Sequence, residues 1–292
     1  MVDISNEILR KLQLTQLITF LEIKRICDKH EIHYTPIGGS LIGVVRHQGF
    51  IPWDDDIDLG MLREDFDKFL SVAKTELSSD FFLQTNETDA EYQHPIARIC
   101  LNGTKMIENC DVGGNMHPGI YTDIFPYDAS PDSKAKMLLH KYMLLWLKLS
   151  NFDRHTHRKP MTLKGRLLYP FFRLSTLPLS DKKVEDLLYK QIKKYNNSKA
   201  SFVVRSGSQY AYEKVRIPRK LMEEFVTMNF EGFPMSVMKG YHQHLSENYG
   251  DYMELPPVDK RNKAKTSIAE LDLGKYNDMN YILERLNTYK EQ

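Results

Sequence analysis

The spacing of hydrophobic and polar residues along the first half of the chain predicts helices alternating with strands. Leu14, Leu17, Ile18 and Leu21 recur at helical spacing, which predicts a helix over residues 6–30. Further helices are expected at 41–46 and 63–75. Short apolar runs bounded by turn residues predict strands at 33–37, 57–61, 81–84, 96–101 and 119–125. This half therefore reads as an α/β (α+β) sheet core flanked by helices.

The pattern changes after Pro131. Long helical periods dominate residues 133–150 and 181–195, and a mixed section follows with a strand near 225–230 and a helix at 236–249. We therefore expect two regions. Residues 1–131 form a catalytic core, and the mainly helical residues 132–292 complete the binding site for the substrates.

Overall composition describes an ordinary globular protein. The 292 residues include 40 basic and 39 acidic side chains, for a net charge of +1. That balance argues against a protein that coats nucleic acid through bulk charge, and we expect no nucleic-acid partner. The three cysteines, Cys27, Cys100 and Cys110, suggest no disulfide framework. With no export signal and no run of roughly 20 apolar residues, we expect a cytoplasmic protein.

The charge is unevenly distributed along the chain. Residues 134–199 hold sixteen lysines and arginines against four acidic residues, which is a net charge of +12 and leaves −11 for the rest. Bulky apolar residues are mixed with these cations, as in surfaces that bind membrane headgroups or anionic glycans. We expect residues 134–199 either to contact the inner face of a membrane or an anionic acceptor, or to pack their basic surface against the acidic part.

The most informative segment runs from Gly38 to Gly60 and contains Asp54, Asp55, Asp56 and Asp58. Gathered carboxylates repel one another, so a fold that collects them usually supplies a cation or neighbouring positive charge. Strand alternation places Asp56 and Asp58 on one face, where they could share a hard divalent ion such as Mg²⁺. Asp54 and Asp55 precede the strand and are expected in a loop, as caps or as support for the metal-binding pair. A solvated acidic turn is the other interpretation.

The residues before this acidic run suggest phosphate binding. Gly38 and Gly39 permit close backbone approach, and Ser40 is placed to cap the next helix. Arg46 could reach a phosphate oxygen or form a salt bridge to the aspartates. Two further candidates follow: Trp53 as a stacking surface or a packing residue, and Arg98 as a phosphate partner or a surface charge.

The segment Gly38 to Gly60 closely resembles the signature of the LicD family, which belongs to the nucleotidyltransferase-fold superfamily. A second stretch, YTDIFPYD, resembles the family's second motif and nominates Asp123 as a third carboxylate. A third stretch, YGDYMELPP at 249–257, resembles its C-terminal motif. The resemblance implies a nucleotidyltransferase-like mixed sheet, with Asp56, Asp58 and Asp123 as metal-binding and catalytic residues and Mg²⁺ or Mn²⁺ as cofactor.

The resemblance also implies a reaction. LicD proteins transfer phosphocholine from CDP-choline to a hydroxyl of a cell-surface glycan such as teichoic acid, lipopolysaccharide or capsule. Related members transfer polyol phosphates, so transfer of glycerol phosphate or ribitol phosphate from another CDP-alcohol is the alternative. The expected partners are the CDP-alcohol and a glycan or lipid-linked oligosaccharide acceptor. An inactive glycan-binding scaffold with the same fold is the non-enzymatic alternative.

Overall fold

The computed structural model describes residues 4–92, 94–109, 111–155, 167, 170–171, 174–208, 210–261 and 267–290, and side chains within 152–155 are outside that description. The chain forms two compact units. The first combines Met1–Pro126 with Leu221–Gln292, and the second is Tyr127–Lys220. The expected roles of residues 1–131 and 132–292 stay a prediction.

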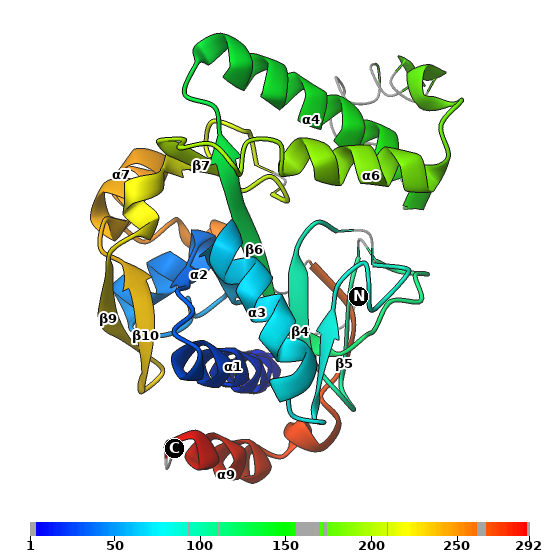
Figure 1. The fold of residues 1–292 in the computed structure, drawn as a ribbon. Coiled ribbons are helices and arrows are strands. Elements are labelled where there is room, and N and C mark those ends of the chain that lie inside the picture. The colour runs from blue at the N-terminus through cyan, green and yellow to red at the C-terminus, as the bar shows by residue number, and fades with distance from the viewer. Residues whose placement is uncertain are drawn as a thin grey trace. The chain divides into compact units, whose positions relative to one another are not determined.

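The first unit is built on a mixed sheet, and the fold is α/β as the sequence predicts (Figure 1). β1 (Thr35–Pro36) lies at one edge, and the strands that follow across the sheet are β2 (Asp58–Leu62), β6 (Ile120–Ser130), β4 (Ala97–Leu101) and β3 (Phe81–Gln84). The β4–β6 and β3–β4 pairs are antiparallel. β6 lies at the centre, so residues near its start are supported on both sides.

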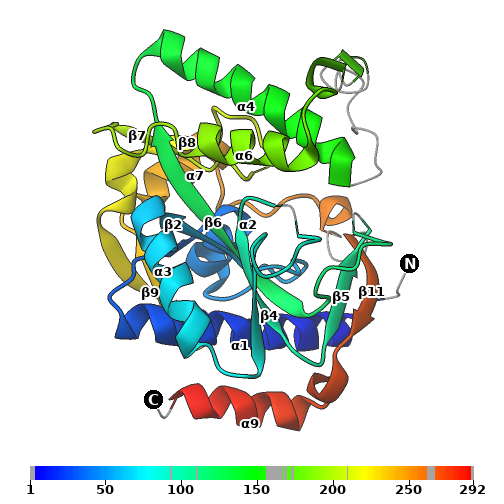
Figure 2. The same ribbon diagram turned by 45° about the vertical axis from the view of Figure 1, so that its right-hand side comes forward.

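Helices flank this sheet. α1 (Asn6–Lys29) begins where the Ser5 hydroxyl accepts a hydrogen bond from the Ile8 amide, and it buries Leu17, Ile18 and Leu21. α3 (Arg63–Glu76) follows β2 directly. Both ribbon views place α9 (Met279–Lys290) alongside α1 (Figure 2). Segments from the two ends of the chain therefore share one core.

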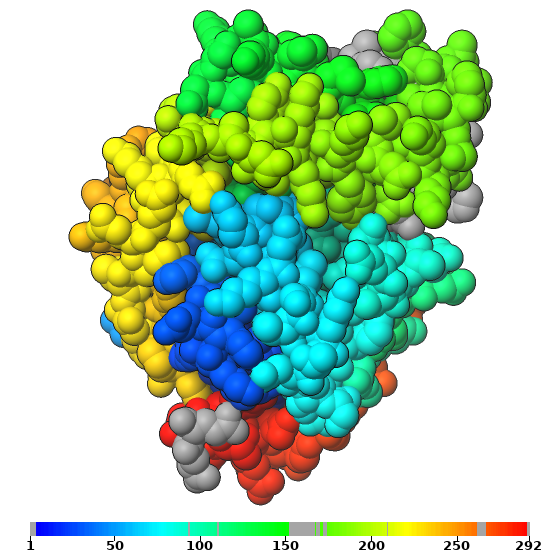
Figure 3. Space-filling model, in the orientation of Figure 1, coloured from blue at the N-terminus to red at the C-terminus, as the bar shows by residue number. Residues whose placement is uncertain are grey.

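Two antiparallel strand pairs complete the first unit. β5 (Lys105–Glu108) pairs with β11 (Ile268–Asp272), and β9 (Phe225–Phe230) pairs with β10 (Phe233–Met238). In the space-filling view the yellow segment near 225–238 lies against the blue N-terminal segment (Figure 3), consistent with the ion pair between Arg10 and Glu231. The sequence prediction of a helix from residue 236 is wrong. Met235 and Val237 are fully buried at the two-residue period of a strand, and α7 (Tyr241–Tyr249) begins only afterwards.

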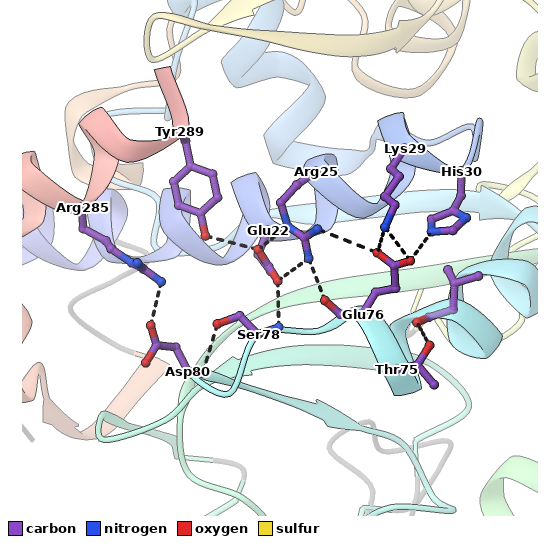
Figure 4. Close-up of polar contacts among 11 residues, drawn as sticks. Glu22, Arg25, Lys29, His30, Thr75, Glu76, Ser78, Asp80, Arg285 and Tyr289 are labelled. Atoms are coloured by element: carbon purple, nitrogen blue, oxygen red, sulfur yellow. Dashed lines mark hydrogen bonds and ion pairs between the residues drawn. The ribbon is translucent and has the colours of Figure 1, made fainter. Parts of the chain in front are cut away.

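A buried carboxylate ties three elements of this unit together (Figure 4). Glu22 on α1 is 2% exposed and accepts two hydrogen bonds from Arg25, at 2.9 and 3.0 Å. It also accepts from the Ser78 amide at 3.0 Å and from the Tyr289 hydroxyl at 3.4 Å. Glu22 thus links α1 to the α3–β3 loop and to α9.

The second unit contains α4 (Lys134–His155), α6 (Asp181–Ile192) and the strands β7 (Phe202–Val204) and β8 (Arg216–Pro218). Leu144 and Leu147 of α4 pack against Leu188 and Ile192 of α6. Much of the basic stretch between these helices lies outside the described residues. None of the helices in the described part of the chain has the length and apolar character that crossing a bilayer requires.

The remaining helical turns are short. They comprise α2 (Gly38–Ile42), the π-helical turn η1 (Gly43–His47), and the 3₁₀ turns η2 (Arg219–Met222), η3 (Val258–Lys260) and η4 (Gly274–Asn277).

Candidate active site

The glycine turn connects β1 to a short helix. Gly38 has φ +59°, a left-handed conformation that a glycine adopts without strain. α2 begins at Gly38 itself, three residues earlier than the sequence predicts, and its N-cap is Ile37. Ser40 therefore lies inside the helix and is not its cap. Its hydroxyl instead accepts a hydrogen bond of 2.9 Å from the Asp58 amide, which ties the helix to β2.

The acidic residues before β2 form a loop whose backbone is hydrogen-bonded to side chains of α1. Asp54 and Asp55 are 6% and 5% exposed, in a loop as the sequence predicts. Gln13 donates to the Asp54 carbonyl at 2.9 Å, and Gln16 donates to the Asp55 carbonyl at 2.7 Å. The sequence analysis missed both glutamines. Their only signal is two amides on the apolar face of an amphipathic helix.

Carboxylate oxygens gather around this loop. Asp54, Asp55 and Asp56 each offer an oxygen, and these atoms lie within 4.8 Å of one another. A Cβ atom on Gly39 would come within 2.7 Å of an Asp54 oxygen, and one on Gly38 within 3.9 Å of an Asp58 oxygen. The absence of a side chain at Gly39 is therefore what lets the Asp54 carboxylate approach the turn, whereas a Cβ at Gly38 would make only an ordinary contact.

Asp123 on β6 joins the same cluster. Its amide donates to the Ile57 carbonyl at 3.1 Å, so it meets the chain between Asp56 and Asp58. Ile57 and Leu59 are almost fully buried while Asp56 and Asp58 are partly exposed, which confirms the predicted alternation. The pKa of the Asp123 carboxyl is raised, chiefly by burial and further by the negative charge of Asp56. The backbone thus brings Asp123 beside the Asp56–Asp58 segment, whereas the carboxylate oxygens that lie within 4.8 Å of one another among the described residues are those of Asp54, Asp55 and Asp56.

Arg98 forms a buried ion pair with Asp123. The two residues are direct partners across the β4–β6 pair, and Arg98 Nε donates to Asp123 Oδ1 at 2.7 Å. The guanidinium lies 3.7 Å from the ring centroid of Tyr121 and 5.2 Å from that of Tyr92. Arg98 is therefore neither a surface charge nor open to solvent, and it acts on the site through Asp123.

Arg46 makes contacts that the sequence did not predict. Its Nη1 donates to the carbonyls of Tyr252, at 2.8 Å, and Glu254, at 3.0 Å. Within the described residues it forms no ion pair with an aspartate. Trp53, partly exposed, has His47 at its edge and the Arg261 guanidinium 5.1 Å from its ring centroid. Arg46 thus joins two of the sequence motifs that lie about 200 residues apart.

Comparison with known proteins identifies the family. The nucleotidyltransferase domain described as LicD/FKTN/FKRP matches residues 31–142. The chain is also 34% identical over 256 residues to the lipopolysaccharide cholinephosphotransferase LicD of Haemophilus influenzae, covering 86% of this chain and 93% of that protein. The chain belongs to the LicD family. It is also 43% identical over 56 residues to an uncharacterised protein of Rickettsia prowazekii, covering 19% of this chain and 20% of that one.

The part of the chain that matches the LicD domain contains most of the geometry above. Gly38 to Asp58, Arg98 and Asp123 all lie within residues 31–142. The Tyr249–Pro257 stretch lies beyond it, yet Arg46 binds its carbonyls directly. The candidate site therefore contains residues from both sequence segments of the first unit.

Proposed function

We propose that this chain transfers phosphocholine from CDP-choline to a hydroxyl of a cell-surface glycan or its precursor, such as lipopolysaccharide, capsule or teichoic acid. Family membership supports a transferase, and the relative from Haemophilus influenzae is named for transfer of phosphocholine to lipopolysaccharide. The observation that carries the proposal is the carboxylate cluster of Asp54, Asp55 and Asp56 beside a glycine turn, with the Asp123 amide bonded to the neighbouring Ile57 carbonyl.

The carboxylate cluster fits a hard divalent cation. Its donors are all oxygens, and the oxygen atoms of Asp54, Asp55 and Asp56 come close enough for one ion to bridge them. We propose Asp56, Asp58 and Asp123 as the residues that hold Mg²⁺ or Mn²⁺, with Asp54 and Asp55 supporting them. A bound ion supplies positive charge that neutralises a diphosphate. Asp123 is also the carboxylate that we propose to accept the proton of the acceptor hydroxyl.

The glycine turn is the proposed donor site. The backbone at Gly38 and Gly39 has no side chain to keep a phosphate away, and both glycines face the carboxylates. Ser40 orients β2 through the Asp58 amide, and Arg46 supplies a guanidinium on the same short segment. These residues would hold the phosphates next to the acidic cluster.

Release of CMP tests the proposal. The purified protein is incubated with Mg²⁺, a glycan acceptor and CDP-choline, CDP-glycerol or CDP-ribitol in turn. We expect CMP from CDP-choline, and loss of more than about 100-fold in Asp58→Asn, since replacing even groups behind a metal ligand costs up to that factor. Asp67→Asn on the exposed face of α3 is the matched control. Mn²⁺ binding, measured without substrate, should be lost in Asp58→Asn and retained in Asp67→Asn.

Each alternative has its own outcome in this assay. CMP from CDP-glycerol or CDP-ribitol, but not from CDP-choline, would replace phosphocholine by a polyol phosphate. Glycan binding without CMP from any donor would establish the scaffold. Full activity of Asp58→Asn would contradict the metal site.

Residues 134–199 are the proposed contact with a membrane that carries a lipid-linked acceptor. On α4 the side chains of Leu139, Tyr142 and Leu145 are 56%, 58% and 41% exposed, and Lys134 and Lys136 precede them. Apolar and basic side chains on one helix are typical of binding to anionic headgroups. Co-sedimentation with vesicles of anionic phospholipid at low salt should fall in Leu139→Ser/Tyr142→Ser. Equal binding to neutral vesicles, or none to either, would exclude this contact.

A further inference from the structure

Two arginines from distant parts of the sequence are oriented by one short stretch of backbone. Arg46 Nη1 donates to the Tyr252 and Glu254 carbonyls, and Arg261 Nε donates to the Pro256 carbonyl at 2.7 Å. Each bond uses only part of a guanidinium, which carries five N–H donors. Within the described residues, Arg46 Nη2 and both Nη atoms of Arg261 have no hydrogen-bond partner and could bind a ligand.

Among the described residues, no carboxylate contacts either guanidinium group. Neither Arg46 nor Arg261 forms an ion pair within the part of the chain that the structure describes. They are close enough to interact, since burial and the charge of Arg261 together lower the pKa of Arg46. The five residues that follow Arg261 in the sequence add two lysines and no acidic residue. Two neighbouring cations that repel each other raise the free energy, and an anion bound between them would lower it.

The contacts around Trp53 place this pair beside the acidic loop. The Arg261 guanidinium lies over the Trp53 ring, and Trp53 directly precedes Asp54. Arg46 Nε donates to His47 Nε2 at 3.0 Å, so that nitrogen accepts and carries no proton. Burial and the charge of Arg46 also lower the pKa of His47. The histidine thus adds no competing charge, and the two arginines remain the cations of this cluster.

We propose that Arg46 and Arg261 form one binding site for a phosphate oxyanion, with Trp53 as its wall. Planar guanidinium groups match phosphate oxygens through paired hydrogen bonds, which a lysine cannot reproduce. The oxyanion comes either from the diphosphate of the nucleotide donor or from a phosphate on the acceptor. Its assignment to a substrate rests on the proposed function, whereas the binding itself does not.

A purely structural role makes a different prediction. If the arginines only fasten residues 252–261 to the core, their removal lowers stability and leaves anion binding unchanged. Calorimetric titration of the metal-free protein separates the two roles, with inorganic pyrophosphate, CDP-choline and glycerol 3-phosphate as probes. Thermal unfolding of every variant is followed in parallel.

Arg261→Ala is the main variant, because it leaves both carbonyl bonds of Arg46 in place. We expect pyrophosphate affinity to fall by about 10- to 100-fold, the value of one charge-assisted hydrogen bond or two. Arg46→Ala should do the same, and the double variant should lose less than the two effects combined, because both arginines act on one ligand. Arg261→Lys and Arg46→Lys should recover the fold and only part of the affinity. Lys260→Ala removes the adjacent exposed charge and should change affinity by less than about twofold.

Each result of these titrations supports a different interpretation of the site. A loss confined to pyrophosphate and CDP-choline assigns the site to the donor, and a loss confined to glycerol 3-phosphate assigns it to a phosphorylated acceptor. Wild-type affinity in both alanine variants would overturn the proposal, as would an equal loss in Lys260→Ala. If the wild type binds pyrophosphate through the arginines yet releases no CMP from any donor, the proposed function fails and the oxyanion site stands.

Discussion

Replacing Arg98 by methionine removes the positive charge nearest to Asp123 while keeping most of the side-chain volume. The two side chains are only 10% and 15% exposed and lie 2.7 Å apart. Removing one partner of such a buried pair costs about 3–5 kcal/mol, because the other charge stays buried without compensation. For a unit of this size, each kcal/mol corresponds to about 2–4 °C in Tm, so Arg98→Met should lower Tm by about 6–20 °C.

Thermal and urea unfolding of a double-mutant cycle provide the test. Arg98→Met/Asp123→Asn should be more stable than the sum of the two single losses predicts, because no unpaired charge remains. Arg98→Lys should be intermediate, since lysine keeps the charge but not the stacking between Tyr121 and Tyr92. Lys74→Met is the control, because its side chain and that of its partner Glu87 are 52% and 72% exposed and such pairs contribute about 0–1 kcal/mol. If Arg98→Met costs no more than Lys74→Met, the buried pair contributes no more stability than a surface pair.

Three further changes have defined outcomes. Glu22→Ala should reduce the unfolding free energy by about 3 kcal/mol, because it removes a buried carboxylate that accepts from Arg25, Ser78 and Tyr289; Lys105→Ala, in a pair whose side chains are 45% and 53% exposed, should cost under about 0.5 kcal/mol in the same urea titration. Gly39→Ala should weaken Mn²⁺ binding, since the new methyl would lie 2.7 Å from an Asp54 oxygen, and wild-type affinity would contradict this. Burial lowers the pKa of Lys148 to about 8 against 10.5 unfolded, so its ammonium opposes folding below pH 8 and this cost disappears as the pH rises toward 10.5. Lys148→Met should therefore raise Tm more at pH 7 than at pH 10, and an equal gain at both would exclude the cause.

Local periodicity was enough to predict much of the fold. The helical period placed the start of α1 at Asn6, and the strands Phe81–Gln84 and Phe225–Phe230 have the predicted bounds. The failures lie where two periods compete. Phe233–Met238 contains apolar residues that fit either period over a short window, and only pairing with β9 decides for a strand.

In the candidate site, too, some features follow from neighbouring residues in the sequence and others from contacts between distant segments. Alternation along one strand was enough to place Asp56 and Asp58 on one face. The pairing of Arg98 with Asp123 depends on the register of β4 against β6, which is set by the whole sheet. Sequence alone therefore left Arg98 as a candidate phosphate partner. The register makes it the partner of a carboxylate.

The support beneath the acidic loop explains how the fold tolerates its carboxylates. Gln13 and Gln16 bind the loop through the carbonyl oxygens of Asp54 and Asp55. These bonds fix the path of the backbone whatever the charge of the side chains, so the shape of the loop does not require an ion. Gln16 also donates to the Tyr121 carbonyl at 3.4 Å, two residues before Asp123. One buried amide on α1 thus touches both the acidic loop and β6, and it is the fold, more than the motif, that sets the distance between them.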